Sequence, residues 1–200
     1  DDALASIDGT ICRRTGYKSI ERAALNITRL LKWRKDEDVI EYAINKKIIP
    51  AYFSSIKKRL LMLLLKENGR MMIEKPAPVI FVGGGTDLYV QKHEEMVHSN
   101  SKYLSDDLVL KAIRKVGSLC ILGGSVTVTD LIESPIIRKY FPGFLKYSKL
   151  VSSTQIRNMA TLAGNFVNAS PIGDFTVFFL ALDARIKLSN GIKNRELHLR

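Results

Sequence analysis

The sequence predicts an α+β protein, with helices in its first part and a mixture of strands and helices in its second. Residues 19–33 carry apolar side chains at steps of three and four, which is the spacing of one helix face. Short apolar runs at 79–82 and 119–122 end at glycines and are typical of buried strands. A chain of 200 residues forms one compact domain, or one domain with an appended piece.

The first part of the chain is expected to form two helices. The apolar face of the helix over 19–33 consists of Ile20, Ala23, Ala24, Ile27, Leu30 and Leu31. A charged cluster then interrupts the periodicity and Pro50 ends whatever precedes it, so residues 34–50 are expected to be a linker. The second helix is capped by Ser54 or Ser55 and is expected to stop at Gly69.

Three segments are expected to run as strands into small-residue turns. The runs at 79–82 and 119–122 meet glycines directly, and the more polar stretch 159–162 meets Ala163-Gly164-Asn165. The segment 126–151 is expected to be mainly helical, with Thr129 or Asp130 as a helix cap. Pro135 and Pro142 are expected to interrupt the helix.

The last part of the chain predicts an edge strand. Residues 185–188 alternate between polar and apolar side chains, and Asn190-Gly191 after them is a hairpin turn signal. We expect the final segment to be left without a partner strand.

Composition excludes several classes of protein. The longest uninterrupted apolar runs, such as Leu60–Leu65, contain six residues, whereas a membrane-spanning helix needs about 18. The chain opens with Asp1-Asp2-Ala3-Leu4, which lacks an initiator Met and any signal-peptide pattern, so we expect part of a longer cytoplasmic protein without a membrane partner. The two cysteines are too few for a disulfide framework, which agrees with a reducing compartment.

The net charge of +11 raises nucleic acid as a partner. The basic residues are spread along the chain, however, and the most basic segments have no aromatic stacking platform beside them. These segments contain Lys46, Lys47, Lys57, Lys58 and Arg59. A nucleic-acid-binding domain is therefore a minor alternative, and we expect no nucleic-acid partner.

Gly83-Gly84-Gly85-Thr86-Asp87 follows a predicted strand and is a candidate phosphate-binding turn. Backbone N–H groups without neighbouring Cβ atoms can approach a pyrophosphate closely. The pattern is neither a P-loop nor a dinucleotide-binding glycine motif. A purely structural role for these glycines stays open, because tight turns need positive φ.

Short polar side chains are unusually dense over residues 152–174. One interpretation is a loop that wraps a long ligand, and the other is a loop whose Ser, Thr and Asn side chains satisfy their own backbone. The three histidines show no metal-ligand spacing, so we expect them at the surface. Cys120 lies in an apolar run and is expected to be a buried structural thiol.

Four ordered motifs resemble the FAD domain of molybdenum-containing hydroxylases, and within that family the small subunit of bacterial xanthine dehydrogenases. The motifs are Phe81-Val82-Gly83-Gly84-Gly85-Thr86-Asp87-Leu88, Leu122-Gly123-Gly124-Ser125-Val126-Thr127, residues 155–165 (QIRNMATLAGN) and residues 169–174 (ASPIGD). The resemblance implies a two-subdomain FAD-binding domain of the molybdenum hydroxylase (PCMH) type over 51–200, incomplete at its C-terminal end. It further implies that residues 1–33 are the last part of a helical [2Fe-2S] domain, and 34–50 the linker.

The resemblance also implies roles for individual residues. The turn from Phe81 to Leu88 would cradle the FAD pyrophosphate, with Thr161, Gly164 and Asn165 forming a second phosphate-binding turn. Asp174 would accept hydrogen bonds from the ribose side of the adenosine, and Ser170 belongs to the same loop. Val151 aligns with a position near the flavin ring. No residue of the chain is expected to act as a catalytic acid, base or nucleophile.

The iron–sulfur motif is broken in this sequence. Cys12 resembles a cluster ligand of the family, but Arg14 stands where the motif C-R-C-T-G-Y has its second cysteine. A [2Fe-2S] cluster of this kind needs four thiolates, so we expect this chain to hold none. The molybdenum cofactor is expected only in a partner subunit or domain.

These observations favour an oxidoreductase component that passes electrons from iron–sulfur clusters through FAD to NAD or another acceptor. The fragment alone is not expected to turn over a substrate. The alternative is a non-catalytic module that binds nucleotide weakly or only mediates subunit contacts.

Overall fold

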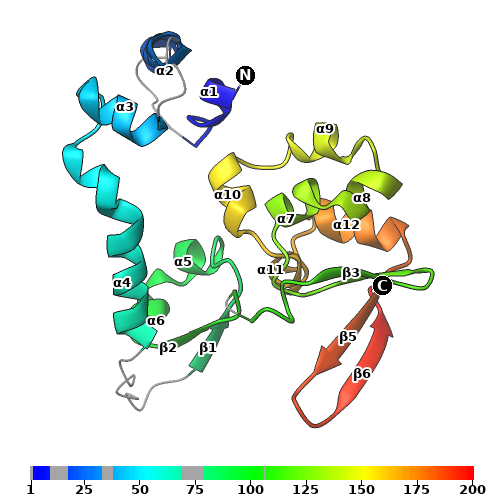
Figure 1. The fold of residues 1–200 in the computed structure, drawn as a ribbon. Helices are drawn as coiled ribbons and strands as arrows, with labels where there is room; N and C mark the ends of the chain where they lie inside the picture. Colours follow the sequence, from blue (N-terminus) through cyan, green and yellow to red (C-terminus); the bar gives the residue numbers. More distant parts are fainter. Residues whose placement is uncertain (1, 10–17, 33–37, 69–78, 106) are drawn as a thin grey trace. The chain divides into compact units, whose positions relative to one another are not determined.

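The computed structural model describes residues 2–9, 18–32, 38–68, 79–105 and 107–200 of the chain (Figure 1). The chain divides into two compact units, residues 1–75 and residues 76–200. The fold class is α+β, as expected, and the strands of the described residues all lie in the second unit.

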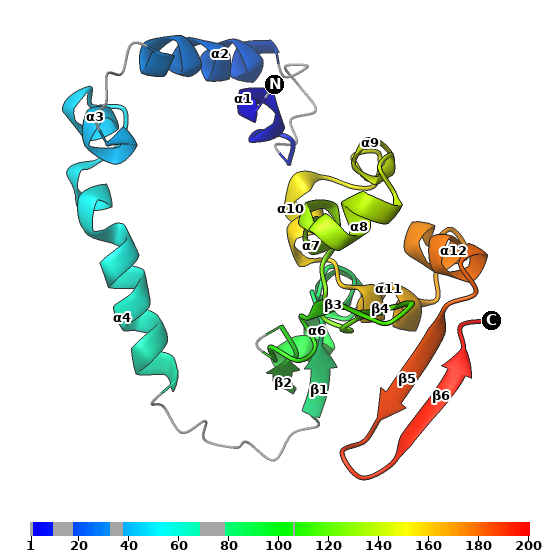
Figure 2. The same cartoon turned by 45° about the vertical axis from the view of Figure 1, so that its right-hand side comes forward.

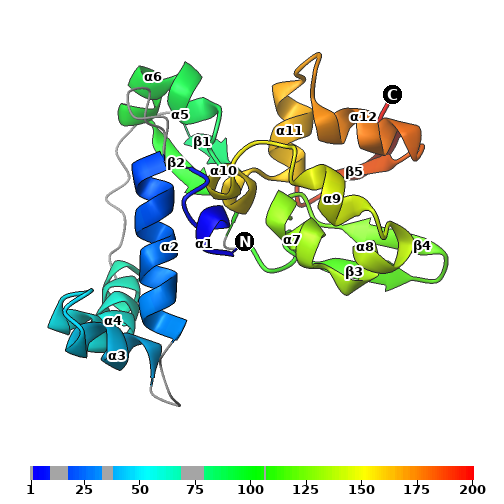
Figure 3. The same cartoon turned by 90° about the horizontal axis from the view of Figure 1, so that it is seen from above.

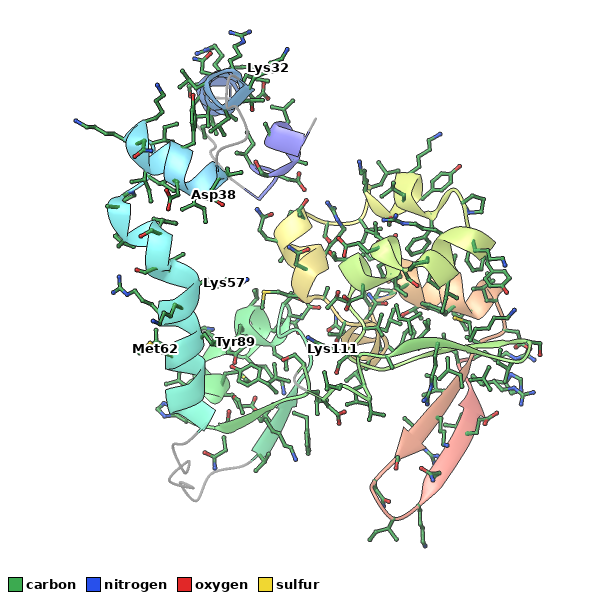
Figure 4. All side chains as sticks on the ribbon, viewed as in Figure 1. Lys32, Asp38, Lys57, Met62, Tyr89 and Lys111 are labelled. Atoms are coloured by element: carbon green, nitrogen blue, oxygen red, sulfur yellow. The ribbon has the colours of Figure 1, made fainter. Side chains whose placement is uncertain are left out.

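The described part of the first unit is helical. It contains α1 (Asp2–Ala5), α2 (Lys18–Lys32), α3 (Val39–Asn45), the 3₁₀ helix η1 (Ala51–Ser55) and α4 (Ile56–Asn68). Helices α2 and α4 confirm the two expected helices. Helix α3 lies inside the segment 34–50 that was expected to be a linker. Asp38, labelled in Figure 4, begins this helix because its Oδ1 accepts hydrogen bonds from the amides of Ile40 (2.8 Å) and Glu41 (3.1 Å).

The second unit alternates short strands and short helices. Its elements are β1 (Val79–Val82), α5 (Leu88–Gln91), α6 (His93–Val97), β2 (Asn100–Tyr103), β3 (Ile113–Val116), β4 (Leu119–Leu122), α7 (Val128–Glu133), α8 (Pro135–Tyr140), α9 (Phe144–Ser148), α10 (Thr154–Met159), α11 (Leu162–Asn168), α12 (Asp174–Ala181), β5 (Arg185–Ser189) and β6 (Asn194–His198). Of the helices in the described ranges, none is both long enough and apolar enough to cross a membrane.

The described strands form three separate two-stranded sheets. Strands β1 and β2 are parallel, with Val82 opposite Tyr103, and helices α5 and α6 connect them. Strands β3 and β4 form an antiparallel hairpin, and so do β5 and β6. The β5–β6 hairpin extends away from the helices of its unit (Figure 2).

The core of the second unit lies between its helices. Its buried members are Val126, Val128, Leu131, Ile137, Phe144, Leu162, Phe175 and Phe179. Helix α8 lies beside β3 (Figure 3), and phenylalanines of α9 and α12 pack with tilted rings, such as Phe144 and Phe178 at 5.5 Å between centroids. Burial of the core-facing residues of α7, α8, α9, α11 and α12 holds together helices that would be unstable in isolation.

Several expectations at the level of elements were wrong. Residues 159–162 are not a strand, because α10 ends at Met159 and α11 begins at Leu162, with Thr161 making one isolated β-bridge to Thr127. Helix α7 is capped by Thr127, and Asp130 is the third residue of the same capping box. The final segment does have a partner, since β6 pairs with β5 from Arg185–His198 to Ser189–Asn194.

Replacing Leu131 by Ala is expected to destabilise the second unit by about 2–5 kcal/mol, because Leu131 is 1% exposed and its truncation leaves a cavity. Urea unfolding followed by circular dichroism measures the change. Leu150→Ala is the matched control, because Leu150 is 81% exposed and its truncation creates no cavity. Equal midpoints for the two variants would contradict the assigned core.

Candidate functional site

The glycine turn after β1 is pressed against the segment between α10 and α11. A Cβ on Gly84 would lie 1.8 Å from the carbonyl oxygen of Met159, and one on Gly83 would lie 2.6 Å from Thr161 Oγ1. The Met159 carbonyl belongs to the backbone, so glycine is required at position 84, whereas a Cβ at position 83 would require the Thr161 hydroxyl to shift. Gly85 has φ +72°, a conformation that residues with a Cβ adopt rarely. The turn therefore needs its glycines for packing within the protein as well as for any ligand.

The backbone amides of this turn remain available. Within the described residues, no hydrogen bond uses the amide of Gly83, Gly84, Gly85 or Thr86 as its donor. Two carbonyls hold the backbone of the turn in place. The Val82 carbonyl, just before the turn, accepts from the amide of Leu104 (2.8 Å), and the Gly85 carbonyl accepts from that of Tyr89 (3.1 Å). Consecutive free amides held on a fixed backbone suit an anionic ligand such as a pyrophosphate.

The other residues of the predicted turn differ in exposure. Val82 is completely buried and anchors the end of β1, whereas Phe81 is 60% exposed, with Lys102 Nζ 5.7 Å from its ring centroid. Leu88 is half-buried at the start of α5. The Asp87 carboxylate accepts a hydrogen bond of 3.0 Å from the amide nitrogen of Asn168, at the end of α11. No motif in the sequence indicated Asn168, which lies 81 positions further along the chain.

The second predicted turn lies beside the first, and most of its amides are already used. Thr161 caps α11 by accepting from the amide of Gly164 at 3.2 Å. The amides of Leu162 and Ala163 donate to the carbonyls of Val126 and Gly124. Asn165 donates its amide to Thr161 O. This turn therefore forms a wall beside the glycine turn, and the consecutive free backbone donors are on the other segment.

The loop after α11 is organised by Asn165. Its side-chain Oδ1 accepts from both the amide (3.1 Å) and the hydroxyl (3.0 Å) of Thr176 in α12. Ser170 accepts from the amide of Ile172 at 3.3 Å, which closes the loop on itself. Asp174 is exposed in the first turn of α12.

The dense polar residues before α11 mainly satisfy the backbone. Ser153 caps α10. Arg157 is 8% exposed and donates to the carbonyl of Val151 (2.8 Å) and to the hydroxyl of Thr154 (2.8 Å). These contacts favour the interpretation of a self-bonded loop for residues 152–158, because the donors and acceptors serve the protein itself.

Two of the predicted residues, Val151 and Asp174, line one pocket of about 500 Å³. Its other walls are mostly aromatic and come from α8, the connection to α9, α9 itself and α12: Tyr140, Phe141, Pro142, Gly143, Phe144, Tyr147, Ser148, Phe175 and Phe178. Such a pocket suits a planar apolar group, and Asp174 supplies a single carboxylate. The sequence analysis missed these aromatic walls, although the phenylalanines of α12 and the run Phe141–Phe144 were a possible signal.

Lysines lie over both tyrosines of this pocket. Lys115 Nζ is 5.7 Å from the Tyr140 ring centroid, and Lys146 Nζ is 5.7 Å from that of Tyr147. The hydrogen bond from the Lys115 ammonium lowers the pKa of Tyr140 below its usual value and raises the pKa of Lys115. Both pKa shifts have the same cause: the hydrogen bond favours the charged forms, protonated Lys115 and ionised Tyr140.

The expected cysteine and histidine roles have mixed outcomes. Cys12 and Arg14 lie outside the described residues. Cys120 is exposed, so the expectation of a buried thiol was wrong: the Ile113–Leu122 end of its hairpin packs against the core, and Cys120 lies nearer the turn. Partial burial still raises the pKa of the thiol. All three histidines are exposed. The described residues contain no group of three or more metal-ligating side chains.

Residues 67–200 match the family model described as the FAD binding domain in molybdopterin dehydrogenase. The match covers the whole second unit of the fold, with the glycine turn and the aromatic pocket. The chain belongs to this family of FAD-binding domains.

Curated relatives and solved structures agree with the family. The chain is 33% identical over 114 residues to a putative xanthine dehydrogenase FAD-binding subunit of Escherichia coli K12, covering 54% of the chain and 37% of the relative. It is 29% identical over 144 residues to the nicotinate dehydrogenase FAD-subunit of Eubacterium barkeri, covering 68% and 46%. A structure of reconstituted CO dehydrogenase from Oligotropha carboxidovorans superimposes with a TM-score of 0.55 at 27% identity, covering 61% and 43%. The chain spans less than half the length of these proteins.

Replacing Gly84 by Ala is expected to destabilise the second unit by about 1–3 kcal/mol or more, because the new Cβ meets the Met159 carbonyl, which belongs to the backbone and cannot move aside. Gly143→Ala is the control, since its Cβ would meet only the Tyr147 ring at an ordinary 3.4 Å. Thermal unfolding of the two variants measures the difference. A wild-type melting temperature for Gly84→Ala would contradict the close approach of the two backbones.

Tyr140 is expected to ionise at a lower pH than an ordinary tyrosine, because protonated Lys115 stabilises the phenolate. Replacing Lys115 by Met removes this charge, so the pKa of Tyr140 should rise. Absorbance at the tyrosinate band, titrated with pH for the wild type, Lys115→Met and Tyr140→Phe, isolates the contribution of this residue. Identical titration curves for the wild type and Lys115→Met would exclude the interaction.

Proposed function

We propose that this chain is the flavin-binding, electron-transferring part of a xanthine-dehydrogenase-like molybdenum hydroxylase. The observation that carries the proposal is the run of free amides from Gly83 to Thr86, at the end of β1, in a chain that belongs to this family of FAD-binding domains. The relatives named as FAD subunits of xanthine and nicotinate dehydrogenases support it.

In this proposal the four free amides bind the FAD pyrophosphate, with Thr86 as an additional hydroxyl donor. Thr161, Gly164 and Asn165 form the adjoining wall of the site, since the amides of Gly164 and Asn165 are engaged by Thr161. Asp174 accepts hydrogen bonds from ribose hydroxyls. Ser170 shapes the loop before it by closing on Ile172.

The aromatic pocket beside Asp174 supports a place for one of the planar rings of the cofactor. Val151 forms part of its wall, together with the rings of Tyr140 and Phe178. Close aromatic walls exclude water and orient a ring by stacking. FAD, when bound, supplies reversible two-electron chemistry that also proceeds in single-electron steps, and the protein contributes binding and orientation.

The proposal extends to the assembly. Electrons would come from iron–sulfur clusters reduced at a molybdenum cofactor in a partner subunit or domain, and would leave to NAD or another acceptor, in the cytoplasm. Residues 1–33 would be a remnant of a helical iron–sulfur domain that holds no cluster, joined by 34–50 to the flavin domain of 51–200.

The visible absorption spectrum of the purified 200-residue chain, before and after addition of FAD, tests the proposal. Flavin bands that remain after gel filtration, without iron–sulfur bands, are expected. A colourless protein that takes up no added FAD would leave the alternative of a non-catalytic module, and iron–sulfur absorbance would refute the expected loss of the cluster.

Asp174→Asn is expected to weaken FAD binding about tenfold, which corresponds to about 1.4 kcal/mol, because a charged acceptor of the ribose hydroxyls is lost. Quenching of flavin fluorescence during titration of the protein gives the dissociation constant. Glu94→Gln is the matched control, since this side chain is 90% exposed on α6. Equal loss of affinity in both variants would show that charge alone is responsible.

A further inference from the structure

Helix α11 is attached to the glycine turn at both of its ends. At its start, Thr161 Oγ1 lies 2.6 Å from the position of a Cβ on Gly83. At its end, Asn168 Nδ2 donates to Asp87 Oδ2 at 3.0 Å. A helix of seven residues is about 10 Å long, so these two contacts lie well apart along the turn. Two separated contacts fix the direction of the helix relative to the turn, which one contact cannot do.

The Asp87 carboxylate does not do what its position in the sequence predicts. Asp87 directly precedes α5, where an aspartate commonly accepts a hydrogen bond from the next amides of its own helix. Here α5 receives no such side-chain bond from Asp87. The carboxylate is turned to Asn168 instead, 81 residues away. The Asp87 carboxylate thus does not cap its own helix and instead links two segments that are distant in the sequence.

Charge argues against Asp87 as a direct ligand of a pyrophosphate. A carboxylate and a phosphate repel each other, and the repulsion is strongest where they share one small site. The amides of Gly83 to Thr86 point out a site for an anion on the same turn. A carboxylate in this turn is compatible with such a site when the carboxylate accepts a hydrogen bond from an amide group elsewhere and is directed away from the anion.

The other side of the turn is held by a pair of tyrosines. The Tyr89 ring lies against Gly85, where an added Cβ would be 2.7 Å from Cδ2, and the Tyr89 hydroxyl is hydrogen-bonded to that of Tyr103. Tyr103 is paired with Val82 at the end of β1. Tyr89, labelled in Figure 4, therefore connects the helix after the turn to the strand beside it. Because the tyrosines hold this side, the hydrogen bond between Asp87 and Asn168 limits the movement of the other side of the turn.

We propose that Asp87 and Asn168 are a positioning pair, which holds the free amides of the glycine turn at a fixed orientation to α11. The inference rests on the proposed FAD function and changes the role of Asp87 from cofactor ligand to link. The pair acts through the turn, so its two members can be exchanged without loss, whereas a direct ligand cannot be moved to the other segment.

Four proteins test this: the wild type, Asp87→Asn, Asn168→Asp, and the exchange Asp87→Asn with Asn168→Asp. Asn168→Asp places two carboxylates together and is expected to weaken FAD binding about tenfold. Asp87→Asn keeps an amide–amide hydrogen bond and should stay within about twofold of the wild type. The exchanged pair restores a donor and a carboxylate acceptor and is expected to recover the wild-type affinity. Fluorescence quenching of FAD measures all four.

The same variants distinguish the alternatives. If Asp87 contacts FAD directly, Asp87→Asn and the exchanged pair lose affinity together and Asn168→Asp has little effect, which overturns the proposal. Asn194→Asp in β6 is the control for an added negative charge, because it lies on the exposed hairpin.

A second readout needs no cofactor. In the apo protein, hydrogen exchange of the Tyr89 amide, which is bonded to the Gly85 carbonyl, should be about tenfold faster in Asn168→Asp and return to the wild-type rate in the exchanged pair. If the wild type binds no FAD, the proposed function fails while this exchange still decides the positioning role. Unchanged exchange in Asn168→Asp overturns the positioning pair even where FAD binds.

Discussion

The close approach of two backbone segments governs the second unit of this protein. Gly84 comes so near the Met159 carbonyl that a single Cβ would overlap it, whereas Gly83 meets the side chain of Thr161. Because these segments touch through backbone, their separation is set by atoms that have no rotamers to adjust. The start of α11 is fixed by the same contact, and with it the capping bonds that lead on to α12. Substitution at either glycine therefore affects the turn, both helices and the loop between them.

Polar side chains in this unit serve mainly to define backbone directions. Thr127 caps α7, Thr161 caps α11, and the two residues are bridged to each other, while Asn165 holds the start of α12. Each of these bonds satisfies an end of a helix that is too short to be stable alone. This arrangement leaves the amides from Gly83 to Thr86 as a group of donors available to an anion. The site is thus ordered by its surroundings, where many polar groups are hydrogen-bonded within the protein.

Much of the fold could be predicted from the sequence, because periodicity and glycine reveal local structure. Helices α2 and α4, strands β1, β4 and β5 and the last hairpin turn followed from patterns within a few residues. Links across long stretches could not be predicted: nothing near Asp87 indicates Asn168, and nothing near Lys115 indicates Tyr140. The stretch 159–162 was expected to be a strand because it leads into small residues, as 79–82 and 119–122 do. Its single β-bridge, from Thr161, depends on Thr127, which lies elsewhere in the chain. The candidate site was predicted as motifs, whereas its aromatic pocket and its saturated second turn depend on packing.

The β5–β6 hairpin has a consequence for how the domain opens. Its strands are exposed along nearly their whole length, and only Ala184 and Leu199 at its base pack against the core, joined by a backbone hydrogen bond of 2.9 Å. An isolated two-stranded hairpin has marginal stability, so this one depends on its base. Fluctuations that separate its strands therefore cost far less than those that expose the core, and they leave the glycine turn intact. The domain has a hierarchy of opening, in which the hairpin belongs to its lowest level and the core to its highest.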